Sequence, residues 1–417
     1  MNRKDKFVRD PIHGNIKLPE LIARFLQTPE IQRLYNIKQL GFAHLVFPGA
    51  HHTRLEHSLG SCFLASQIVN TLSIDNEKKD VITCAALLHD IGHGPFSHTL
   101  ESLLLEQFGV DHIALTKELI LGNYSILDEH EKNYISSPSV HELIATTSID
   151  KNEIITIIKG KAYGNSYVSQ ILNSTIDVDQ LDYLLRDAYY TGVSYGMIDI
   201  QRLLQTLIIY NDSLAIQRKG VSVVENILMA RGLMYSSVYF HKTVRIAELM
   251  LSKAIEMIKD IAPFEFFRMT DAELVTSLQS MGRYQQEIIT RLKYRNLFKQ
   301  AYAASYNDLD ESAQDEVKRL EDVSYRRKKE EEFEQIFDIP HGHLIIDVPR
   351  TELFMTEPRL HKTDIFVVDN NEKKTLDEYT TVAHAVRTRV TPDWAVMIIS
   401  DEKYRDVISK KVREHLF

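Results

Sequence analysis

Two segments in the first quarter of the chain carry apolar residues at the spacing of an α-helix. The first is TRLEHSLGSCFLASQIVN at 53–70 and the second is VITCAALLHDIGHGPFSH at 81–98, with the polar stretch DNEKK between them. The apolar positions are Leu55, Leu59, Phe63, Leu64 and Ile68 in the first segment and Ile82, Ala86 and Leu87 in the second. This pattern predicts two neighbouring helices, of which the second ends before Gly92.

Polar side chains interrupt the apolar surface of each predicted helix. Arg54 and His57 are three residues apart and share a face of the first helix, while His89 and Asp90 fall in the last turn of the second. Such groups in a core need polar partners or a metal ion. Two neutral imidazoles and a carboxylate suit a borderline divalent ion, which lowers the pKa of bound water and polarises a phosphoryl oxygen. We therefore predict a metal site.

A fourth ligand is expected from a third helical segment, STIDVDQLDYLLRDAYYTG at 174–192. Asp179, Tyr183 and Asp187 recur there at i, i+4 and i+8 and so lie along one helical face. Asp182 and Arg186, also four apart, are expected to form an ion pair on the surface of this helix.

Each of these pieces also has a simpler explanation. With 17 histidines and 58 acidic residues in 417, about one His-Asp dipeptide is expected by chance. An isolated buried histidine is more often a hydrogen-bonded core residue than a ligand. Only the ordered combination of the three segments favours the metal site.

That order, His57, then His89-Asp90, then Asp179, resembles the HD-domain metal-dependent phosphohydrolases. Within them, five motifs between residue 10 and residue 187 are similar to the deoxynucleoside triphosphate triphosphohydrolases. These are DPIHG at 10–14, TPEIQRLYNIKQLG at 28–41, FPGAHHTRLEHSLG at 47–60, HDIGHGPFSH at 89–98 and DVDQLDYLLRD at 177–187. The resemblance implies hydrolysis of deoxynucleoside triphosphates at the α-phosphate, which yields a deoxynucleoside and tripolyphosphate.

The resemblance also implies roles for individual side chains. The metal ligands would be His57, His89, Asp90 and Asp179. Residues beside the scissile phosphate, with candidate proton donors among them, would be His93, His98, Glu101 and His112. The substrate would be bound by Gln39, Leu40, Arg54, Gln180, Tyr183, Asp187, Arg231 and Tyr239. Among these, Tyr183 would pack against C2′ and disfavour a ribose, while Asp187 and Gln39 would hold the 3′-hydroxyl. Without the resemblance, we would interpret Gln39 as a helix cap. For Arg231, a surface salt bridge would then be nearly as good an interpretation as a phosphate contact.

The chain departs from the resembling family at several positions. Glu101 stands where the family usually has aspartate, and Gln180 where well-known members have a triphosphate-binding lysine. Of the regulatory GTP pocket of the animal enzyme, Lys6 and Gln32 match, whereas Gln27 and Tyr35 replace an aspartate and an arginine. We therefore expect nucleotide activation to be absent or to have a different specificity.

The remaining sequence indicates a mainly α-helical protein. We predict an HD-domain helical core at 1–260 and a lobe at 261–417 with helical and α+β character. In the first region, 220–258 reads as one long helix. In the second, a charge-rich helix at 310–335 precedes three strand-like runs, HLIIDVP, DIFVVD and WAVMIIS, and a final helix. We assign this small α+β subdomain to assembly or pocket completion, and the resemblance implies a dimer or tetramer.

The composition restricts the binding partners and the cellular compartment that we expect for this protein. At 417 residues and 44% hydrophobic, the chain can bury a large core. A net charge of −9 argues against broad electrostatic binding to nucleic acid. The sequence contains neither an apolar run of membrane-spanning length nor a signal-peptide core at its start. Cys62 and Cys84 lie in apolar helical patterns, which favours reduced, buried thiols and a cytoplasmic location.

The sequence leaves the metal and the substrate open. A ligand set of two histidines and two aspartates is compatible with Mn, Fe, Zn, Ni, Co or Mg. The same ligands would serve an HD phosphohydrolase acting on a nucleoside monophosphate or a cyclic nucleotide. A non-catalytic nucleotide sensor is a third interpretation.

Overall fold

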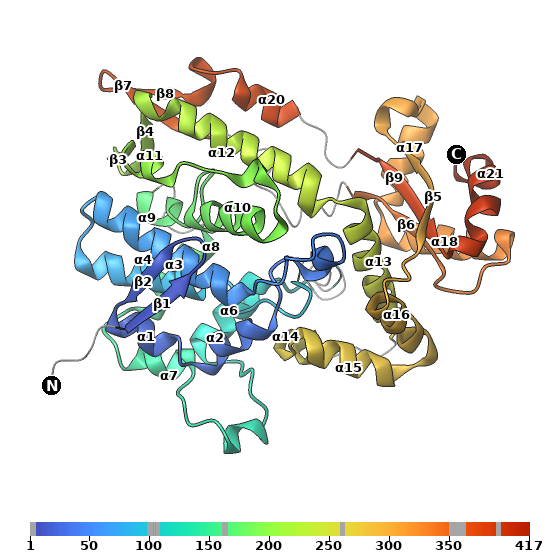
Figure 1. Cartoon of the computed structure of the whole chain (residues 1–417), viewed down its shortest axis with the longest axis horizontal. Helices are drawn as coiled ribbons and strands as arrows, with labels where there is room; N and C mark the ends of the chain where they lie inside the picture. The colour runs from blue at the N-terminus through green and yellow to red at the C-terminus, as the bar shows by residue number, and fades with distance from the viewer. Residues whose placement is uncertain are drawn as a thin grey trace.

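Three packed helices form the centre of the structure. In the computed structural model, which describes residues 6–97, 103, 105, 109–160, 166–258, 263–349, 364–388 and 393–417, helix α3 (Arg54–Thr71) packs against both α4 (Asn76–Leu88) and α10 (Val178–Thr191) (Figure 1). Each helix begins at a capping residue, and the caps are Thr53, Asp75 and Asp177. The two helices predicted around the His-Asp motif are confirmed.

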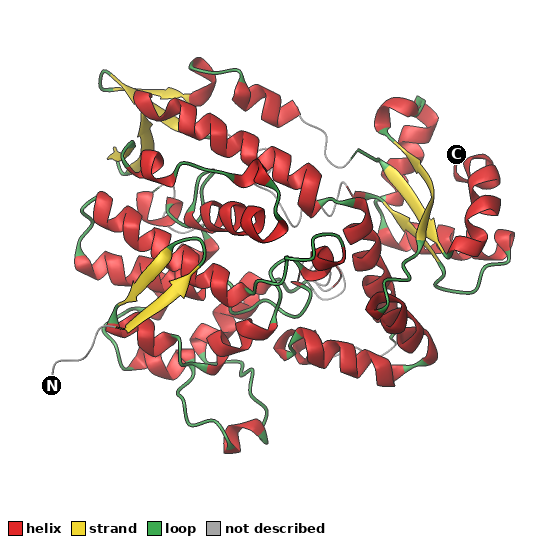
Figure 2. Ribbon diagram, in the orientation of Figure 1, coloured by secondary structure: helices red, strands yellow, loops and turns green. Residues whose placement is uncertain are grey.

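Further helices surround this centre, and helix is the predominant structure throughout (Figure 2). Those before residue 258 are α1 (Glu20–Phe25), α2 (Pro29–Arg33), α6 (His112–Leu121), α7 (Val140–Ala145), α8 (Lys151–Lys159), α9 (Tyr167–Gln170), α11 (Ile200–Leu204), α12 (Val221–Met234) and α13 (Lys242–Glu256). Those after it are α14 (Pro263–Arg268), α15 (Asp271–Met281), α16 (Arg283–Lys293), α17 (Glu311–Leu320), α18 (Val323–Phe337), α20 (Val382–Thr388) and α21 (Arg405–Leu416).

The single long helix predicted at 220–258 is wrong. Helix α12 passes into a π-helical turn, Tyr235–Tyr239, and α13 begins only after His241. His241 has non-helical backbone angles, and its ring accepts the backbone N–H of Thr243 as an N-cap. The sequence did not reveal this break, because apolar residues recur at helical spacing on both sides of it. A π-turn adds one residue to the helix without making the segment less apolar.

The charge-rich helix predicted at 310–335 is likewise two helices, α17 and α18. Asp322 separates them, because its carboxylate accepts the backbone N–H of Tyr325 and starts a new helix. Helix α2, which begins at Pro29, ends at Arg33 and is followed by a 3-10 turn at Leu34–Asn36. Residue Ile37 is already extended, and Lys38 forms a β-bridge with Thr53.

Within the part of the chain that the structure describes, three small sheets accompany the helices. Strands β1 (Lys6–Asp10) and β2 (Gly14–Leu18) form an antiparallel hairpin, and the DPIHG motif makes its turn. The second sheet has the order β3-β4-β7-β8, with β3 (Leu207–Tyr210), β4 (Ser213–Gln217), β7 (Phe366–Asp369) and β8 (Glu372–Thr375). The third is antiparallel in the order β5-β9-β6, with β5 (Lys299–Ala304), β6 (Leu344–Asp347) and β9 (Val396–Ser400).

The three strand-like runs of the C-terminal region therefore belong to two sheets. HLIIDVP and WAVMIIS supply β6 and β9, whereas DIFVVD supplies β7, which pairs in parallel with β4 of the predicted 1–260 region. Strand patterns carry no information about their partners, so the sequence could not separate them. The predicted domain boundary at residue 260 stays a prediction.

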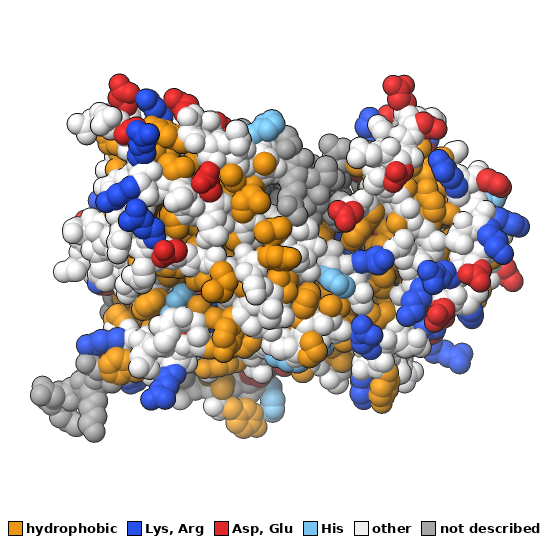
Figure 3. Space-filling model, turned by 45° about the horizontal axis from the view of Figure 1, so that its top comes forward, with side chains coloured by type: hydrophobic (Ala, Val, Ile, Leu, Met, Phe, Trp, Pro, Cys, Tyr) orange, Lys and Arg blue, Asp and Glu red, His pale blue; other side chains and the backbone are white. Residues whose placement is uncertain are grey.

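The sheet β5-β9-β6 and helices α17, α18 and α21 form the C-terminal lobe, which lies at the right of Figure 1. Its apolar cluster includes Val317, Phe333, Ile346, Ile398 and Val412 and is separate from the main core. On the face shown in Figure 3, Lys and Arg side chains gather together with Asp and Glu side chains over this lobe. A mainly helical protein with a small α+β lobe is thus confirmed.

Two further expectations concern the core and the membrane. Cys62 and Cys84 are buried and free of disulfides, as predicted. Among the helices that the structure describes, none has both the length and the apolar character needed to cross a bilayer.

One buried carboxyl makes stability pH-dependent. Glu30 on α2 accepts the backbone N–H of Val140 at 3.2 Å, and burial raises its pKa from 4.5 to about 7. Because the folded pKa lies above the unfolded one, the wild type loses stability as pH rises from about 4.5 to 7. We expect Glu30→Gln to raise the free energy of unfolding by about 2–3 kcal/mol at pH 8 and to leave it unchanged near pH 4.5, as measured by urea unfolding. The exposed Glu77→Gln is the control, and equal pH dependence in both variants would contradict the assignment.

Candidate metal centre

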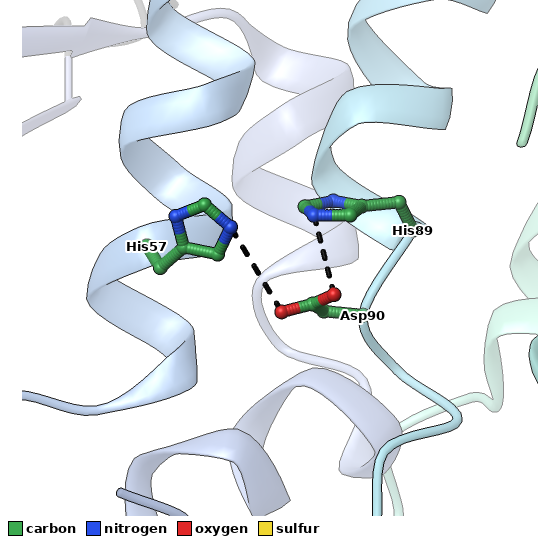
Figure 4. A group of neighbouring side chains, drawn as sticks. All are labelled: His57, His89 and Asp90. Carbon is green, nitrogen blue, oxygen red and sulfur yellow. Dashed lines mark ion pairs between the residues drawn. The ribbon is translucent and has the colours of Figure 1, made fainter. Parts of the chain in front are cut away.

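His57, His89 and Asp90 face one another where α3 passes the C-terminal end of α4 (Figure 4). Asp90 Oδ1 lies 3.2 Å from His89 Nε2, and Asp90 Oδ2 lies 3.9 Å from His57 Nε2. All three residues are buried. His89 is the C-cap of α4 rather than part of its last turn, so the pair sits where the chain leaves the helix.

Asp179 on α10 completes the group. Its Oδ1 atom lies 3.1 Å from His57 Nε2 and 3.8 Å from His89 Nε2. The Asp179 side chain is 20% exposed, whereas that of His57 is 1% exposed. The four predicted ligands therefore converge, and the centre opens toward solvent on the side of Asp179.

The imidazole nitrogens are arranged as metal ligation requires. His89 Nδ1 donates to the carbonyl of Ala86 at 2.8 Å, so Nε2 carries the lone pair, and Nε2 has no hydrogen-bond partner among the described residues. His57 Nδ1 donates to Asp182 Oδ2 at 2.8 Å, which likewise directs Nε2 at the centre. Ligand atoms about 2.0–2.2 Å from one ion lie roughly 3–3.6 Å apart. Two of the observed separations, 3.1 and 3.2 Å, fall within this range, and the other two, 3.8 and 3.9 Å, slightly exceed it, so the four atoms would need to move only slightly to bind a single divalent ion.

Electrostatics also favours a cation at this position. Although burial opposes its charge, hydrogen bonds to Asp179 and Asp182 raise the pKa of His57 to about 10. Asp90 is buried too, yet His89, Arg54 and His93 hold its pKa well below the usual range. The carboxylates of Asp90 and Asp182 thus stay ionised and attract positive charge, which a proton on His57 or a bound metal can supply.

The ion pair expected on the helix surface is buried instead. Arg186 and Asp182 are both fully buried, and Asp182 lies behind His57 as its hydrogen-bond partner. The i,i+4 spacing correctly predicted the pair but could not predict its burial, because the neighbouring α3 covers that face of α10.

A second group of side chains adjoins the four ligands. The rings of His93 and His112 stack with centroids 3.8 Å apart, and Asp90 Oδ1 lies 3.3 Å from His93 Nε2. Burial, with Arg54 and His112 nearby, lowers the pKa of His93 to about 3, so this ring is neutral. Arg54 donates to Asp90 Oδ2 at 2.6 Å and to Ser97 Oγ at 2.8 Å. His98 and Glu101, which the sequence also placed here, lie outside the described residues.

The predicted sugar-binding residues meet on the other side of His57. Tyr239 donates to Asp187 Oδ2 at 2.7 Å, and the rings of Tyr239 and Tyr183 meet edge to face at 5.9 Å. Sequence reasoning missed His52, whose Nε2 lies 2.6 Å from Asp187 Oδ1 and whose ring stacks on Tyr190. The adjacent histidines in HHTRLEH were a signal, but only the fold brings His52 to Asp187.

Two amide side chains are buried beside this group. Gln39 follows the extended Ile37, so it does not cap a helix, and its backbone N–H donates to the carbonyl of His52 at 3.0 Å. Gln180 is fully buried, and its Nε2 lies 3.5 Å from Tyr183 Oη. The Oε1 atoms of Gln39 and Gln180 have no hydrogen-bond partner among the described residues. Leu40, next in the chain, packs in the core.

The remaining predicted residues lie farther along the chain. Arg231 is fully buried in α12, where Nη1 donates to the carbonyl of Thr175 at 3.5 Å. A surface salt bridge for Arg231 is therefore wrong. Lys6 and Gln32, predicted for a regulatory nucleotide, are both exposed.

Comparison with known proteins identifies the family. The chain matches the HD domain over residues 54–187 and the HD associated region over residues 198–417. It belongs to the HD-domain phosphohydrolases. The HD domain match begins at Arg54 and ends at Asp187, so it encloses all four converging ligands.

The proteins similar to this HD protein include some that are named as enzymes and some that are uncharacterised. It is 33% identical to an uncharacterised protein of Methanocaldococcus jannaschii, over 99% of this chain and 83% of that one. It is 30% identical to a deoxynucleoside triphosphate triphosphohydrolase SAMHD1 homolog of Dictyostelium discoideum, covering 71% of this chain and 60% of that relative's length. A phosphohydrolase structure from Bacteroides thetaiotaomicron superposes with a TM-score of 0.70 at 25% identity, covering 95% of this chain and 100% of that one.

The geometry of the centre predicts metal binding by the isolated protein. We expect the chelator-treated chain to bind one Mn²⁺, and we expect His89→Ala to weaken this binding by at least about 100-fold, since loss of an outer hydrogen-bond partner alone costs about 10- to 100-fold. Electron paramagnetic resonance of free Mn²⁺ measures the affinity. The exposed His130→Ala is the matched control, and equal affinity in both variants would remove His89 from the centre.

Proposed function

We propose that this HD protein hydrolyses deoxynucleoside triphosphates at the α-phosphate, in a metal-dependent reaction that yields a deoxynucleoside and tripolyphosphate. The observation that carries the proposal is the convergence of His57, His89, Asp90 and Asp179 with both histidine Nε2 atoms directed at one point. The sequence relationship to proteins named deoxynucleoside triphosphate triphosphohydrolases supports the choice of substrate.

These four side chains would hold a divalent metal, which would supply Lewis acidity and an activated water. Arg54 holds the Asp90 carboxylate in place through its 2.6 Å ion pair. In the proposed reaction a water oxygen attacks the α-phosphorus, the bond to O5′ breaks, and O5′ takes up a proton. His112, which stacks on His93 beside Asp90, is a candidate donor of that proton.

Other side chains would bind the rest of the substrate. Arg231 and Arg54, with the undescribed His98, are proposed to neutralise the phosphates. His93 is neutral and is proposed to contribute a hydrogen bond rather than a charge. Asp187, which His52 and Tyr239 hold from both sides, is proposed to accept the 3′-hydroxyl together with Gln39. The Tyr183 ring, 6.5 Å from the His57 ring, is proposed to pack against C2′, where a ribose hydroxyl would collide with it.

The products distinguish this activity from related ones. We expect phosphorus NMR to show tripolyphosphate after the protein is incubated with Mn²⁺ and the four deoxynucleoside triphosphates, because cleavage at the α-phosphorus leaves the three phosphates joined. Orthophosphate or pyrophosphate as the product would contradict the proposed bond cleavage while leaving the metal centre intact.

Removal of the fourth ligand should abolish turnover. We expect Asp179→Ala to lose activity by at least about 1,000-fold, since catalysis through a metal depends on its complete coordination, with an unchanged circular dichroism spectrum. Tyr189→Phe, at an exposed position on the same helix, is the control and should retain activity. A folded Asp179→Ala variant with full activity would exclude Asp179 from the site.

The buried Gln180 favours one alternative. A neutral amide stands where well-known relatives have a lysine that binds triphosphate, so the substrate of this protein would carry fewer phosphates. Turnover of a nucleoside monophosphate or a cyclic nucleotide, with triphosphates unchanged, would support this second candidate. Saturable nucleotide binding without any product would instead support a sensor.

Regulation by GTP is expected to be absent or altered. Lys6 and Gln32 match the resembling family's regulatory pocket, but the exposed Gln27 and Tyr35 replace the two charged residues expected beside them. We expect GTP to leave the rate of dATP hydrolysis unchanged in a steady-state assay. A rate increase at low GTP concentration, absent from a Lys6→Ala variant, would contradict this expectation.

A further inference from the structure

We propose that the N-terminal β-hairpin turn is a positioning device for the metal ligand His57. The turn DPIHG lies between β1 and β2, far from His57 in sequence, yet a continuous chain of hydrogen bonds joins them. His13 of the turn contacts Asp182, and Asp182 contacts His57. This assigns to the hairpin a role in the metal centre of the proposed function, on which the inference rests.

Asp182 is the middle of this chain of hydrogen bonds. Its Oδ2 atom accepts from His57 Nδ1 at 2.8 Å and from Arg186 Nε at 2.9 Å. Its Oδ1 atom accepts from His13 Nε2 at 2.7 Å and from Arg186 Nη2 at 3.0 Å. Because Asp182 is fully buried and its oxygens meet donors on three sides, the carboxylate has one orientation available to it.

The turn itself is shaped by a second carboxylate. Asp10 Oδ1 accepts the backbone N–H groups of Ile12 at 2.9 Å and His13 at 2.8 Å, which bends the backbone around it. Asp10 Oδ2 accepts from Arg186 Nη1 at 2.8 Å. Arg186 thus bridges both carboxylates, and the turn is anchored to α10 at two points.

Space for the Asp182 carboxylate is provided by helix α3. Gly60 lies three residues after His57 on that helix, and a Cβ atom at this position would stand 1.8 Å from Asp182 Oδ1 and 2.5 Å from Arg186 Nη2. Any side chain at residue 60 would therefore displace the carboxylate that orients His57. The His13 ring packs on Phe63 of the same helix, with centroids 5.0 Å apart.

The consequence for His57 is a fixed tautomer and a fixed ring plane. A carboxylate accepts and does not donate, so Asp182 keeps the proton of the neutral imidazole on Nδ1 and the lone pair on Nε2. A histidine that could rotate or exchange tautomers would bind a metal more weakly. His13 acts on the metal through Asp182 and is a positioning residue, since it does not itself contact the four ligands in the described structure.

Metal affinity tests the inference without reference to turnover. We expect His13→Phe, which keeps a ring against Phe63 but removes the donor to Asp182, to weaken Mn²⁺ binding by about 10-fold or more. His13→Gln retains an N–H donor and should stay within about threefold of the wild type. The visible spectrum of the Co²⁺ form should change in His13→Phe, because the orientation of one ligand changes. Asn15→Ala, at an exposed position in β2, should change neither measurement.

The outcomes separate the inference from the proposed function. Thermal unfolding of the chelator-treated, metal-free protein is recorded for every variant, so that a loss of folding can be distinguished from a loss of Mn²⁺ affinity. A folded His13→Phe variant with wild-type Mn²⁺ affinity and Co²⁺ spectrum would overturn the inference alone. A wild-type chain that binds no Mn²⁺ would overturn the proposed metal centre and the inference together. If His13→Phe does not fold, His13→Leu, which also removes the donor to Asp182 and keeps an apolar side chain against Phe63, carries the test, with the same expected loss of affinity and the same contrary result.

Discussion

The ionised carboxylates in the protein interior are the constraint on which the rest of the structure depends. Asp90 and Asp182 are almost completely buried, and each ionised carboxylate would lower the stability of the folded protein if it had no cationic or hydrogen-bonding partners. Arg54 pairs with the first and Arg186 with the second. His57 lies between them and contacts both, so the position of one imidazole depends on two buried ion pairs from different helices.

The turn that carries Asp90 is held by residues from distant parts of the chain. Arg33 on α2 donates to the carbonyls of Ile91 and His93 at 2.9 and 2.6 Å, and also to those of Phe267 and Met269 at 2.8 and 3.1 Å. Asp271 at the start of α15 accepts the backbone N–H of Phe96 at 2.9 Å. The loop after His89 therefore contains few regular backbone hydrogen bonds of its own and depends on these side chains for its shape.

Hydrogen bonds also connect the C-terminal half of the chain to the candidate metal centre. Residues of α14 and α15 form hydrogen bonds that hold the turn after His89-Asp90 in place. Strand β7 pairs with β4, which precedes α12, and α12 carries Arg231. The HD associated region is joined to the HD domain by several hydrogen bonds, among them those from the Phe96 N–H to Asp271, from Tyr239 to Asp187 and from Arg231 to the carbonyl of Thr175.

The sequence by itself determined the helices, the four converging ligands and the family. Helical periodicity is local, so the helices could be predicted from spacing, whereas the set His57, His89-Asp90 and Asp179 was predicted because the order of these residues resembles the HD-domain phosphohydrolases. The sequence also indicated the buried cysteines. Its errors were local as well: the breaks at His241 and Asp322 depend on single capping side chains within segments of otherwise uniform character.

Only the tertiary structure decided which polar residues act together. Asp182 and Arg186 looked like a surface pair because their spacing is the same whether their helix face is exposed or covered by α3. His13 and His52 gain partners that are 169 and 135 residues away, and DIFVVD pairs with a strand of the predicted 1–260 region. Burial and long-range pairing follow from how elements pack, and packing is a property of the whole chain that spacing along the sequence does not contain.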